Sequence, residues 1–390
     1  MNNKPALIGG ESEFPRSIPF ARPTLPPFEE LEQGLRDIVE SGMVTKGKYL
    51  KEYEKAISDM LETPYCLGVV NCTMGLFMLL KALGIKGEVI VPSFTFMSSF
   101  HVIELLGLTP VFVDCEKDTF TIDPQKVEEA ITPETSAIMA VSIFGNPPDI
   151  KSLEDIAGRH NLKFIMDSAH SFGTLYYGRP MGSYGDGEVF STSATKLVAT
   201  GEGGVISTKH KEIYEFIKIF REYGNTGDYN CEVAGINGRL SEFHALLGLK
   251  AVPKLEEMAL ARNHIAKTYR ENLTNMPGII FQKIRDGCRS SYKDFAVIID
   301  DIQFGLNRDT LATALLAEGI PTRKYFHPPG HLQKVYRKYK DRYTGRLEVT
   351  EYLSKNSLIL PVYSHMSPDT VRKIVNAVEK IYRFAPEIRK

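Results

Sequence analysis

An aspartate and a lysine stand at the ends of two neighbouring apolar runs. Asp167 closes the run KFIMD, and Lys196 follows the run EVFS in a loop of small residues that leads to a glycine cluster. A lysine amine can form a Schiff base with an aldehyde, and a carboxylate can keep a pyridine nitrogen protonated so that the ring accepts electrons. The pair therefore indicates pyridoxal phosphate chemistry. The alternative interpretations, with each residue taken alone, are a strand-end cap for Asp167 and a solvated loop lysine for Lys196.

The segment VVNCTMGL supplies a candidate anion site for such a cofactor. It places Asn71, Cys72 and Thr73 between an apolar run and a helix start, where free backbone N–H groups and the helix dipole favour a phosphate. Phe96 follows the run EVIV and is the candidate to cover the ring, although most phenylalanines are plain core residues. The sequence has no GxxxxGK[ST] loop, so a nucleotide P-loop is not indicated.

The elements that must position these residues follow from hydrophobic periodicity. Seven short apolar runs alternate with helical segments; they are CLGVV, EVIVP, TPVFVD, SAIMAVS, KFIMD, EVFS and GGVIST. Apolar residues at three- and four-residue spacing predict two helices before the first run, FEELEQGLRDIV and YLKEYEKAISDML. Asp123 and Pro124 mark a further helix start. Strands that are apolar throughout predict an α/β fold with a mainly parallel sheet, covered by helices on both faces.

The pattern changes after the last of these runs. Residues 210–223 and 239–274 are predicted to be mainly helical, and KDFAVII at 293–299 is a strand candidate. Further helices are predicted at NRDTLATALLAEG and at SPDTVRKIVNAVEKIYR. We expect a large domain over residues 1–255 and a smaller α+β domain over residues 256–390.

Composition narrows the class of protein. The chain has 390 residues, of which 43% are hydrophobic and 24% charged, and its net charge is −1. These values are ordinary for a globular protein and predict no attraction to nucleic acid or an anionic membrane. The five cysteines have no CxxC spacing, so neither a disulfide framework nor a metal site is indicated. Without a signal-peptide pattern or an apolar run of about 18 residues, we expect a cytoplasmic protein.

The chain resembles the DegT/DnrJ/EryC1/StrS aminotransferases nearly end to end, on the motifs SGMVTKGKYLKEYEKA, PSFTF, TPVFVD, FGNPPD, MDSAHSFG, FSTSATK, GEGG, AGINGRLSEFHALLG and LPVYSHMSPDTV. This resemblance implies a fold-type I pyridoxal phosphate enzyme with a seven-stranded-type sheet. It implies transfer of an amino group from glutamate to a nucleotide-linked keto-sugar, with pyridoxamine phosphate as the intermediate. It also implies a homodimer with shared active sites, in surface glycan (lipopolysaccharide O-antigen) or deoxyaminosugar biosynthesis.

The resemblance assigns cofactor roles to individual residues. It implies that Lys196 carries the Schiff base, that Asp167 pairs with the pyridine nitrogen, and that Phe96 stacks on the ring. His170 occupies a position that is often glutamine in the family, beside the ring hydroxyl, and an imidazole can make the same hydrogen bond.

The resemblance also implies a set of phosphate ligands. These are Thr73 and Ser191, the backbone at Cys72, and Asn237 reaching over from the partner subunit. Two positions depart from the family pattern: the common SGT loop reads Asn-Cys-Thr here, and Ser193 stands where many relatives have histidine. Neither departure removes a group that the chemistry requires.

Substrate choice is less sharply indicated. Thr45, Tyr325 and His327 match regions that approach the sugar or nucleotide in relatives, but they also suit a helix cap, a packed tyrosine and a surface histidine. The resemblance of the segments TLPPFEE, FGNPPD and MDSAHSFG to those of relatives favours amination at C4 of a dTDP-linked 4-keto-6-deoxy sugar. The alternatives are a C3-keto or UDP-linked substrate, a dehydratase, and a non-catalytic ligand-sensing member. Lys196 argues against the last two, because similar dehydratases have histidine there and a non-catalytic chain needs no Schiff base.

Overall fold

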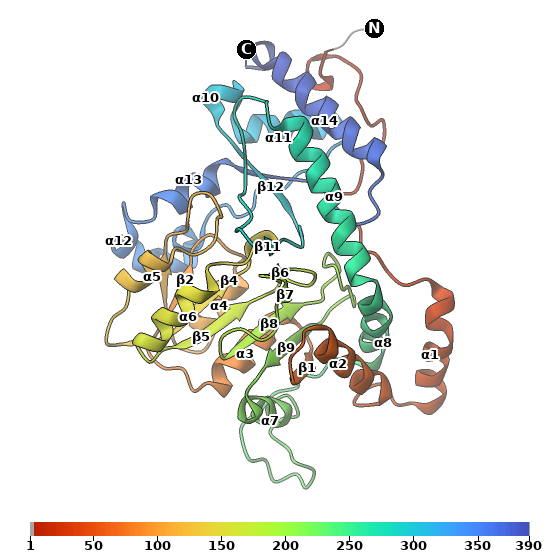
Figure 1. Ribbon diagram of the computed structural model, residues 1–390, viewed down its shortest axis with the longest axis vertical. Coiled ribbons are helices and arrows are strands. Elements are labelled where there is room, and N and C mark those ends of the chain that lie inside the picture. The colour runs from red at the N-terminus through yellow and green to blue at the C-terminus, as the bar shows by residue number, and fades with distance from the viewer. Residues whose placement is uncertain (1–3, 390) are drawn as a thin grey trace.

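A seven-stranded sheet forms the centre of the larger part of the molecule (Figure 1). The computed structural model describes residues 4–389. From one edge of the sheet to the other, the strands are β1 (Tyr65–Val69), β9 (Gly204–Thr208), β8 (Gly187–Ser191), β5 (Lys163–Asp167), β4 (Thr135–Val141), β2 (Glu88–Pro92) and β3 (Thr109–Val113). All seven predicted apolar runs are therefore strands of one sheet.

The sheet is mostly parallel, as predicted. Strands β8, β5, β4, β2 and β3 pair in parallel, whereas β9 runs antiparallel to both of its neighbours. Strand β5 lies between β4 and β8, so its last residue, Asp167, is at the middle of the sheet's carboxyl edge. Ligands bind at this edge in open α/β sheets.

Helices cover both faces because successive residues of each strand point to opposite sides. Val89 and Val91 of β2 belong to one apolar cluster, together with side chains of α3 (Cys72–Ala82), α4 (Ser98–Leu105) and α7 (Lys211–Phe220). Ile90 belongs to the cluster on the other face, which is completed by α2 (Lys48–Met60), α5 (Pro124–Glu129), α6 (Ile150–Arg159) and α8 (Glu242–Ala251). Helix α1 (Phe28–Ser41) packs on α8, and the Asp123 side chain caps α5 as predicted.

A second unit lies beyond the long helix α9 (Leu255–Leu273), which connects the two parts in Figure 1. Its antiparallel sheet has the order β10 (Ile279–Phe281), β12 (Phe295–Ile299), β13 (Ser357–Leu360). Helices α9, α11 (Arg308–Ala317) and α14 (Pro368–Arg383) pack with it in one apolar cluster. The shorter elements are β6 (Leu175–Tyr176), β7 (Arg179–Pro180), β11 (Cys288–Arg289), α10 (Asp301–Phe304), α12 (Lys340–Tyr343), α13 (Glu348–Asn356) and α15 (Ala385–Ile388).

Segments from each side of the predicted domain boundary, between residues 255 and 256, pack on the other unit. The boundary itself stays a prediction. Phe14 and Ile18, near the N-terminus, pack on the apolar cluster of the second unit. In the other direction, Tyr336 and Tyr343 of the C-terminal part pack beneath the large sheet. The first and the last described segments lie near α14 at the top of Figure 1. Among residues 4–389, no helix has the length and apolar character needed to cross a membrane.

Candidate active site

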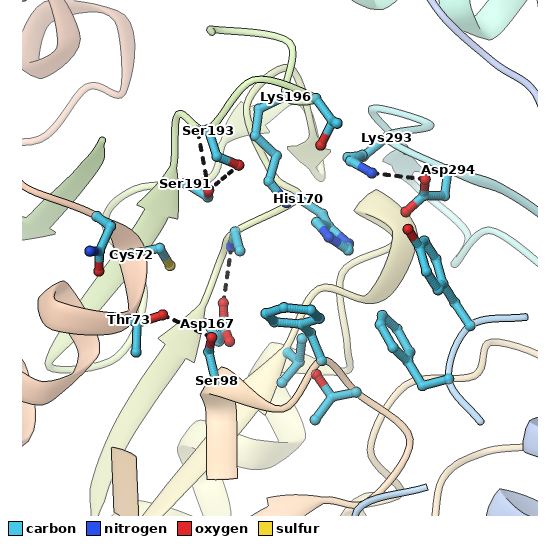
Figure 2. Close-up of a pocket in the computed structure, with 18 of the residues that line it drawn as sticks. Cys72, Thr73, Ser98, Asp167, His170, Ser191, Ser193, Lys196, Lys293 and Asp294 are labelled. Atoms are coloured by element: carbon cyan, nitrogen blue, oxygen red, sulfur yellow. Dashed lines mark hydrogen bonds and ion pairs between the residues drawn. The ribbon is translucent and has the colours of Figure 1, made fainter. Parts of the chain in front are cut away.

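A cavity of about 350 Å³ opens at the carboxyl edge of the large sheet (Figure 2). Eight of the residues predicted for the site line it: Cys72, Thr73, Phe96, Asp167, His170, Ser191, Lys196 and Tyr325. They come from the ends of separate strands, from the start of α3 and from the second unit. The structure therefore brings together residues that are far apart in the sequence, and most of the predicted site lies around a single cavity.

Asp167 is buried at the end of β5, with 4% of its surface exposed. Its Oδ2 accepts a hydrogen bond from the Ser99 hydroxyl at 2.7 Å, and its Oδ1 accepts one from the Ala169 backbone N–H at 3.1 Å. Burial raises the pKa of the carboxyl, and these two bonds and the positive charge of Lys196 oppose the rise. The carboxylate is thus held in one orientation at the cavity wall, where it can pair with a positively charged ring nitrogen.

Lys196 comes from the loop after β8, and its backbone N–H donates to the Ser193 carbonyl at 2.9 Å. Loss of water around the ammonium, and next the positive charge of Lys293, lower the pKa of Lys196 to about 8. At neutral to mildly alkaline pH a substantial fraction of this amine is therefore unprotonated, which is the form that attacks an aldehyde.

Hydroxyl pairs and a helix start form an anion cradle on one side of the cavity. The Asn71 side chain caps α3 by accepting from Met74 N–H at 2.8 Å, and the first N–H groups of the helix have no partner within it. The Thr73 and Ser98 hydroxyl oxygens lie 2.8 Å apart, and those of Ser191 and Ser193 lie 3.2 Å apart. These donors, all labelled in Figure 2, can hold a phosphate.

Close backbone approach at this cradle depends on Gly204. A Cβ atom there would lie 2.7 Å from the Cys72 backbone nitrogen and 2.8 Å from the carbonyl carbon of Asn71. The Cys72 side chain is itself buried, and its thiol donates weakly to the Val189 carbonyl of β8 at 3.8 Å. A cysteine in place of the family's glycine is accommodated in this way.

His170 presents a proton donor to the cavity. Its Nδ1 accepts a hydrogen bond from the Phe144 backbone N–H at 3.1 Å, so the neutral ring carries its proton on Nε2. Burial, and next the charges of Lys196 and Lys293, hold the pKa of His170 well below its usual range. The neighbouring aromatic surface is Phe96, whose side chain is 49% exposed although it lines the cavity. Such an apolar surface is suited to covering a flat ring.

Three predicted residues lie outside the lining of this cavity. Thr45 pairs with Ser241 through the backbone, and Asn237 pairs with Glu222 in the same way. His327 contacts the Ser354 hydroxyl through Nδ1 at 3.2 Å. Their roles toward substrate or partner subunit therefore stay predictions.

Sequence reasoning missed an ion pair in the cavity wall. Lys293 and Asp294 both line the cavity, both are buried, and Lys293 Nζ lies 2.8 Å from Asp294 Oδ1. The only local signal is that two charged residues open an otherwise apolar strand, KDFAVII. Ser98, Thr95 and Phe326 also line the cavity and carried no signal of their own.

The residues present fit pyridoxal 5′-phosphate. The cradle suits its phosphate, Asp167 suits its ring nitrogen, and the His170 Nε2–H suits its ring hydroxyl. Lys196 provides an amine with the lowered pKa that capture of an aldehyde requires.

Comparison with known proteins gives consistent results. The model of the DegT/DnrJ/EryC1/StrS aminotransferase family matches residues 28–379. A dTDP-4-amino-4,6-dideoxy-D-glucose transaminase of Shigella dysenteriae is 34% identical over 94% of this chain and 99% of its own length. The crystal structure of DesI with its TDP-sugar product superposes with a TM-score of 0.89 at 31% identity, covering 99% of this chain and 97% of DesI. The pyridoxal phosphate form of Spr1654 from Streptococcus pneumoniae gives a TM-score of 0.87 at 25% identity, covering 95% of this chain and 99% of Spr1654.

Proposed function

The chain belongs to the DegT/DnrJ/EryC1/StrS aminotransferase family and is a pyridoxal phosphate-dependent sugar aminotransferase, and from this premise we propose its donor and acceptor. The donor is glutamate, and the acceptor is a dTDP-linked sugar with a 4-keto-6-deoxy ring that is aminated at C4. The observation that carries the cofactor-dependent amino transfer is the convergence of Lys196, Asp167 and an anion cradle on one cavity. The product serves surface glycan or deoxyaminosugar biosynthesis in the cytoplasm.

Bound pyridoxal phosphate supplies an electron sink for the carbon that loses its proton. The chain's own residues supply the rest. Asp167, fixed by Ser99 and Ala169, orients the ring by its nitrogen. His170 would donate from Nε2 to the ring hydroxyl oxygen, and Phe96 would cover one face of the ring.

Lys196 is the proton carrier in this proposal. Its amine would hold the cofactor and, when free, would serve as the acid and base of the reaction. With a pKa of about 8, Nζ could accept a proton from the donor's α-carbon and give it up again within the same site. The same transfers in reverse then place the amino group on the sugar carbon, so one lysine serves both halves of the reaction.

Support for the acceptor comes from two relatives. The Shigella dysenteriae protein is described as a transaminase of dTDP-4-amino-4,6-dideoxy-D-glucose, and DesI was crystallised with a TDP-sugar product. Both align over more than nine tenths of this chain. Tyr325 from the second unit lines the cavity and is available to the sugar, and Asn237 outside it is available to the active site of a partner subunit.

The test follows the visible absorbance of the purified protein with pyridoxal phosphate. We expect a yellow band that bleaches with glutamate and returns when a dTDP-linked 4-keto-6-deoxy sugar is added. The Lys196→Ala variant should show no such band. Return of the band with a 3-keto sugar alone would replace C4 by C3 in the proposal. A band that glutamate does not bleach would exclude glutamate as the donor.

A further inference from the structure

The Lys293–Asp294 ion pair stands at the start of β12, where the second unit meets the cavity (Figure 2). The two side chains are 7% and 3% exposed. Burying two charges is costly unless they are well paired and hydrogen-bonded. Here one bond of 2.8 Å joins Lys293 Nζ to Asp294 Oδ1, and Asp294 Oδ2 is buried with no hydrogen-bond partner among residues 4–389. A buried carboxylate oxygen without a donor calls for a functional explanation.

The backbone that carries the pair is held rigidly on both sides. The Arg262 guanidinium donates to the carbonyls of Tyr292 and Lys293 at 3.3 and 3.1 Å, and it is 3% exposed. The Ser291 hydroxyl donates to the His170 carbonyl at 2.5 Å, which ties this loop to the cofactor side of the cavity. The pair is therefore positioned relative to the cofactor site by the main chain, and only its side chains are left to rearrange.

The pair contains one of the few positively charged side chains in the cavity wall. Among the described residues that line the cavity, Lys196 and Lys293 are the two lysines, and no arginine lines it. Lys196 is committed to the cofactor, so Lys293 is the cation that remains on this chain for an anionic substrate. Asp294 and Tyr325 line the same cavity, and burial and then the negative charge of Asp294 raise the pKa of that tyrosine. Tyr325 is the lining residue predicted to approach the sugar.

An aminotransferase admits two different substrates to one place. Under the proposed function, on which this inference rests, the donor carries carboxylates, whereas the reacting sugar ring of the acceptor presents neutral hydroxyls and is joined to a charged diphosphate. We propose that the Lys293–Asp294 pair is the element that distinguishes them: it opens to give Lys293 to a carboxylate of the amino donor, and Asp294 to a hydroxyl of the sugar. Each substrate takes one member of the pair, and the pair closes again when the cavity is empty.

The test measures binding to the pyridoxal phosphate-loaded enzyme by calorimetry with two unreactive probes. Glutarate has the carboxylates of the donor without an amino group, and dTDP-glucose has sugar hydroxyls without a keto group. We expect Lys293→Gln to weaken glutarate at least about tenfold, because a charge-assisted bond is lost and Asp294 is left to repel the probe. Asp294→Asn should bind glutarate as tightly as the wild type or more tightly, since Lys293 is released from its partner.

For dTDP-glucose, the two variants should rank in the opposite order of affinity. Asp294→Asn should weaken dTDP-glucose several-fold, whereas Lys293→Gln should leave its binding unchanged or tighter. A pair that only supports the structure would weaken both probes in both variants, and that result overturns the inference. Weaker dTDP-glucose binding in Lys293→Gln would assign the lysine to the diphosphate and would also overturn it.

Folding and controls are built into the same experiment. Because a single neutralisation leaves a buried charge unpaired, the double variant Lys293→Gln/Asp294→Asn is measured as well, and it should bind both probes weakly while keeping the cofactor band. The matched control is Lys283→Gln, which breaks an exposed ion pair with Asp286 at 3.9 Å and should change the affinity for neither probe.

The outcomes separate this inference from the proposed function. If the band bleaches with glutamate while Lys293→Gln and Asp294→Asn have the same effect on both probes, this inference fails and the proposed function stands. If glutamate does not bleach the wild-type band, the proposed donor fails.

Discussion

At the scale of single residues, the surroundings of each side chain set its chemistry. Lys126 is an exposed salt-bridge partner on the surface. Lys196 is a buried amine in the cavity wall, and burial lowers its pKa to about 8. Asp167 and His170 are likewise tuned by burial, which favours the neutral form of both groups. The residue types were visible in the sequence, but the direction of these shifts required the packed structure.

The lowered pKa of Lys196 predicts how the cofactor-free protein captures pyridoxal phosphate. Only the neutral amine attacks the aldehyde, so the capture rate should rise with pH and level off above about 8. Stopped-flow absorbance over a series of pH values measures this profile. In Lys293→Gln the plateau should move to higher pH, because the positive charge that helps to lower the pKa is removed. A wild-type rate that continues to rise beyond pH 10, as for a solvated lysine, contradicts the prediction.

At the scale of elements, strand ends and helix starts position the site. The carboxyl end of β5 supplies Asp167, the start of α3 supplies the anion cradle, and β9 returns antiparallel beside them. The antiparallel return places Gly204, the first residue of β9, against the start of α3. The cradle is thus a property of three elements in contact.

Gly204→Ala tests the contact between β9 and α3. The new methyl group would lie 2.7 Å from the Cys72 nitrogen, so the two elements must separate and the cradle must widen. We expect cofactor affinity, measured by absorbance titration, to fall by at least about tenfold. Gly158→Ala is the control, because its Cβ meets nothing within 4 Å and alanine stabilises a helix by up to about 1 kcal/mol. Unchanged affinity in Gly204→Ala would mean that the cradle does not hold the phosphate.

A second contact between elements fastens the N-terminal segment to the second unit. The fully buried Glu318 carboxylate accepts hydrogen bonds from the backbone N–H groups of Ala6 and Glu13 at 2.8 and 2.9 Å. Lys380 of α14 donates to the same carboxylate at 2.8 Å. One side chain therefore satisfies three donors from two distant parts of the chain.

Glu318→Ala should destabilise the protein by about 3–5 kcal/mol, because Lys380 would be left buried without its main partner. Urea unfolding measures the loss, and the N-terminal segment should become a site of early proteolysis. The control Glu387→Ala breaks the exposed pair with Lys4 at 3.3 Å and should cost less than about 1 kcal/mol. Equal stability of the two variants would show that the buried cluster does not anchor the segment.

At the scale of the whole molecule, two units and the chain ends enclose the cavity. Phe94 and Phe144 of the large unit pack with Phe326 and Ile298 of the second unit in one apolar cluster next to the site. The second unit contributes Lys293, Asp294 and Tyr325 to the cavity wall. Asn237, which lies outside this wall, is the residue expected to reach the site of a partner subunit.

Mixing two inactive variants tests the shared active site. Lys196→Ala removes the amine, and Asn237→Asp places a negative charge where the partner's phosphate is expected. In a mixed dimer, one site has an intact lysine from one subunit and an intact asparagine from the other. We expect each variant alone to be inactive and the mixture, after subunit exchange, to recover up to about one quarter of wild-type activity. No recovery despite demonstrated exchange would place Asn237 outside the partner's site.

Residue types and their spacing were enough to predict much of the local structure and to name the main candidate cofactor groups. All seven apolar runs became strands of the large sheet, and Asp123 caps α5, because strand burial and helix capping depend on residues that are near one another in the chain. Asp167 and Lys196 could be singled out because Asp167 is the last residue of a strand and Lys196 lies in the loop that follows another. Strands β10 and β13 escaped prediction, since three or four residues carry too short a pattern.

The choice of distant groups that share the cavity, and the effect of their surroundings on them, depends on packing between remote parts of the chain. In the sequence, Lys293 and Asp294 are only two charged residues at the start of a predicted strand. In the folded chain, the packing of the second unit puts both in the wall of the candidate cofactor cavity. The same holds for the Glu318 cluster and for the antiparallel return of β9. Burial and pairing across the chain set these features, and a local pattern of residue types does not encode the partner that a charge will meet after folding.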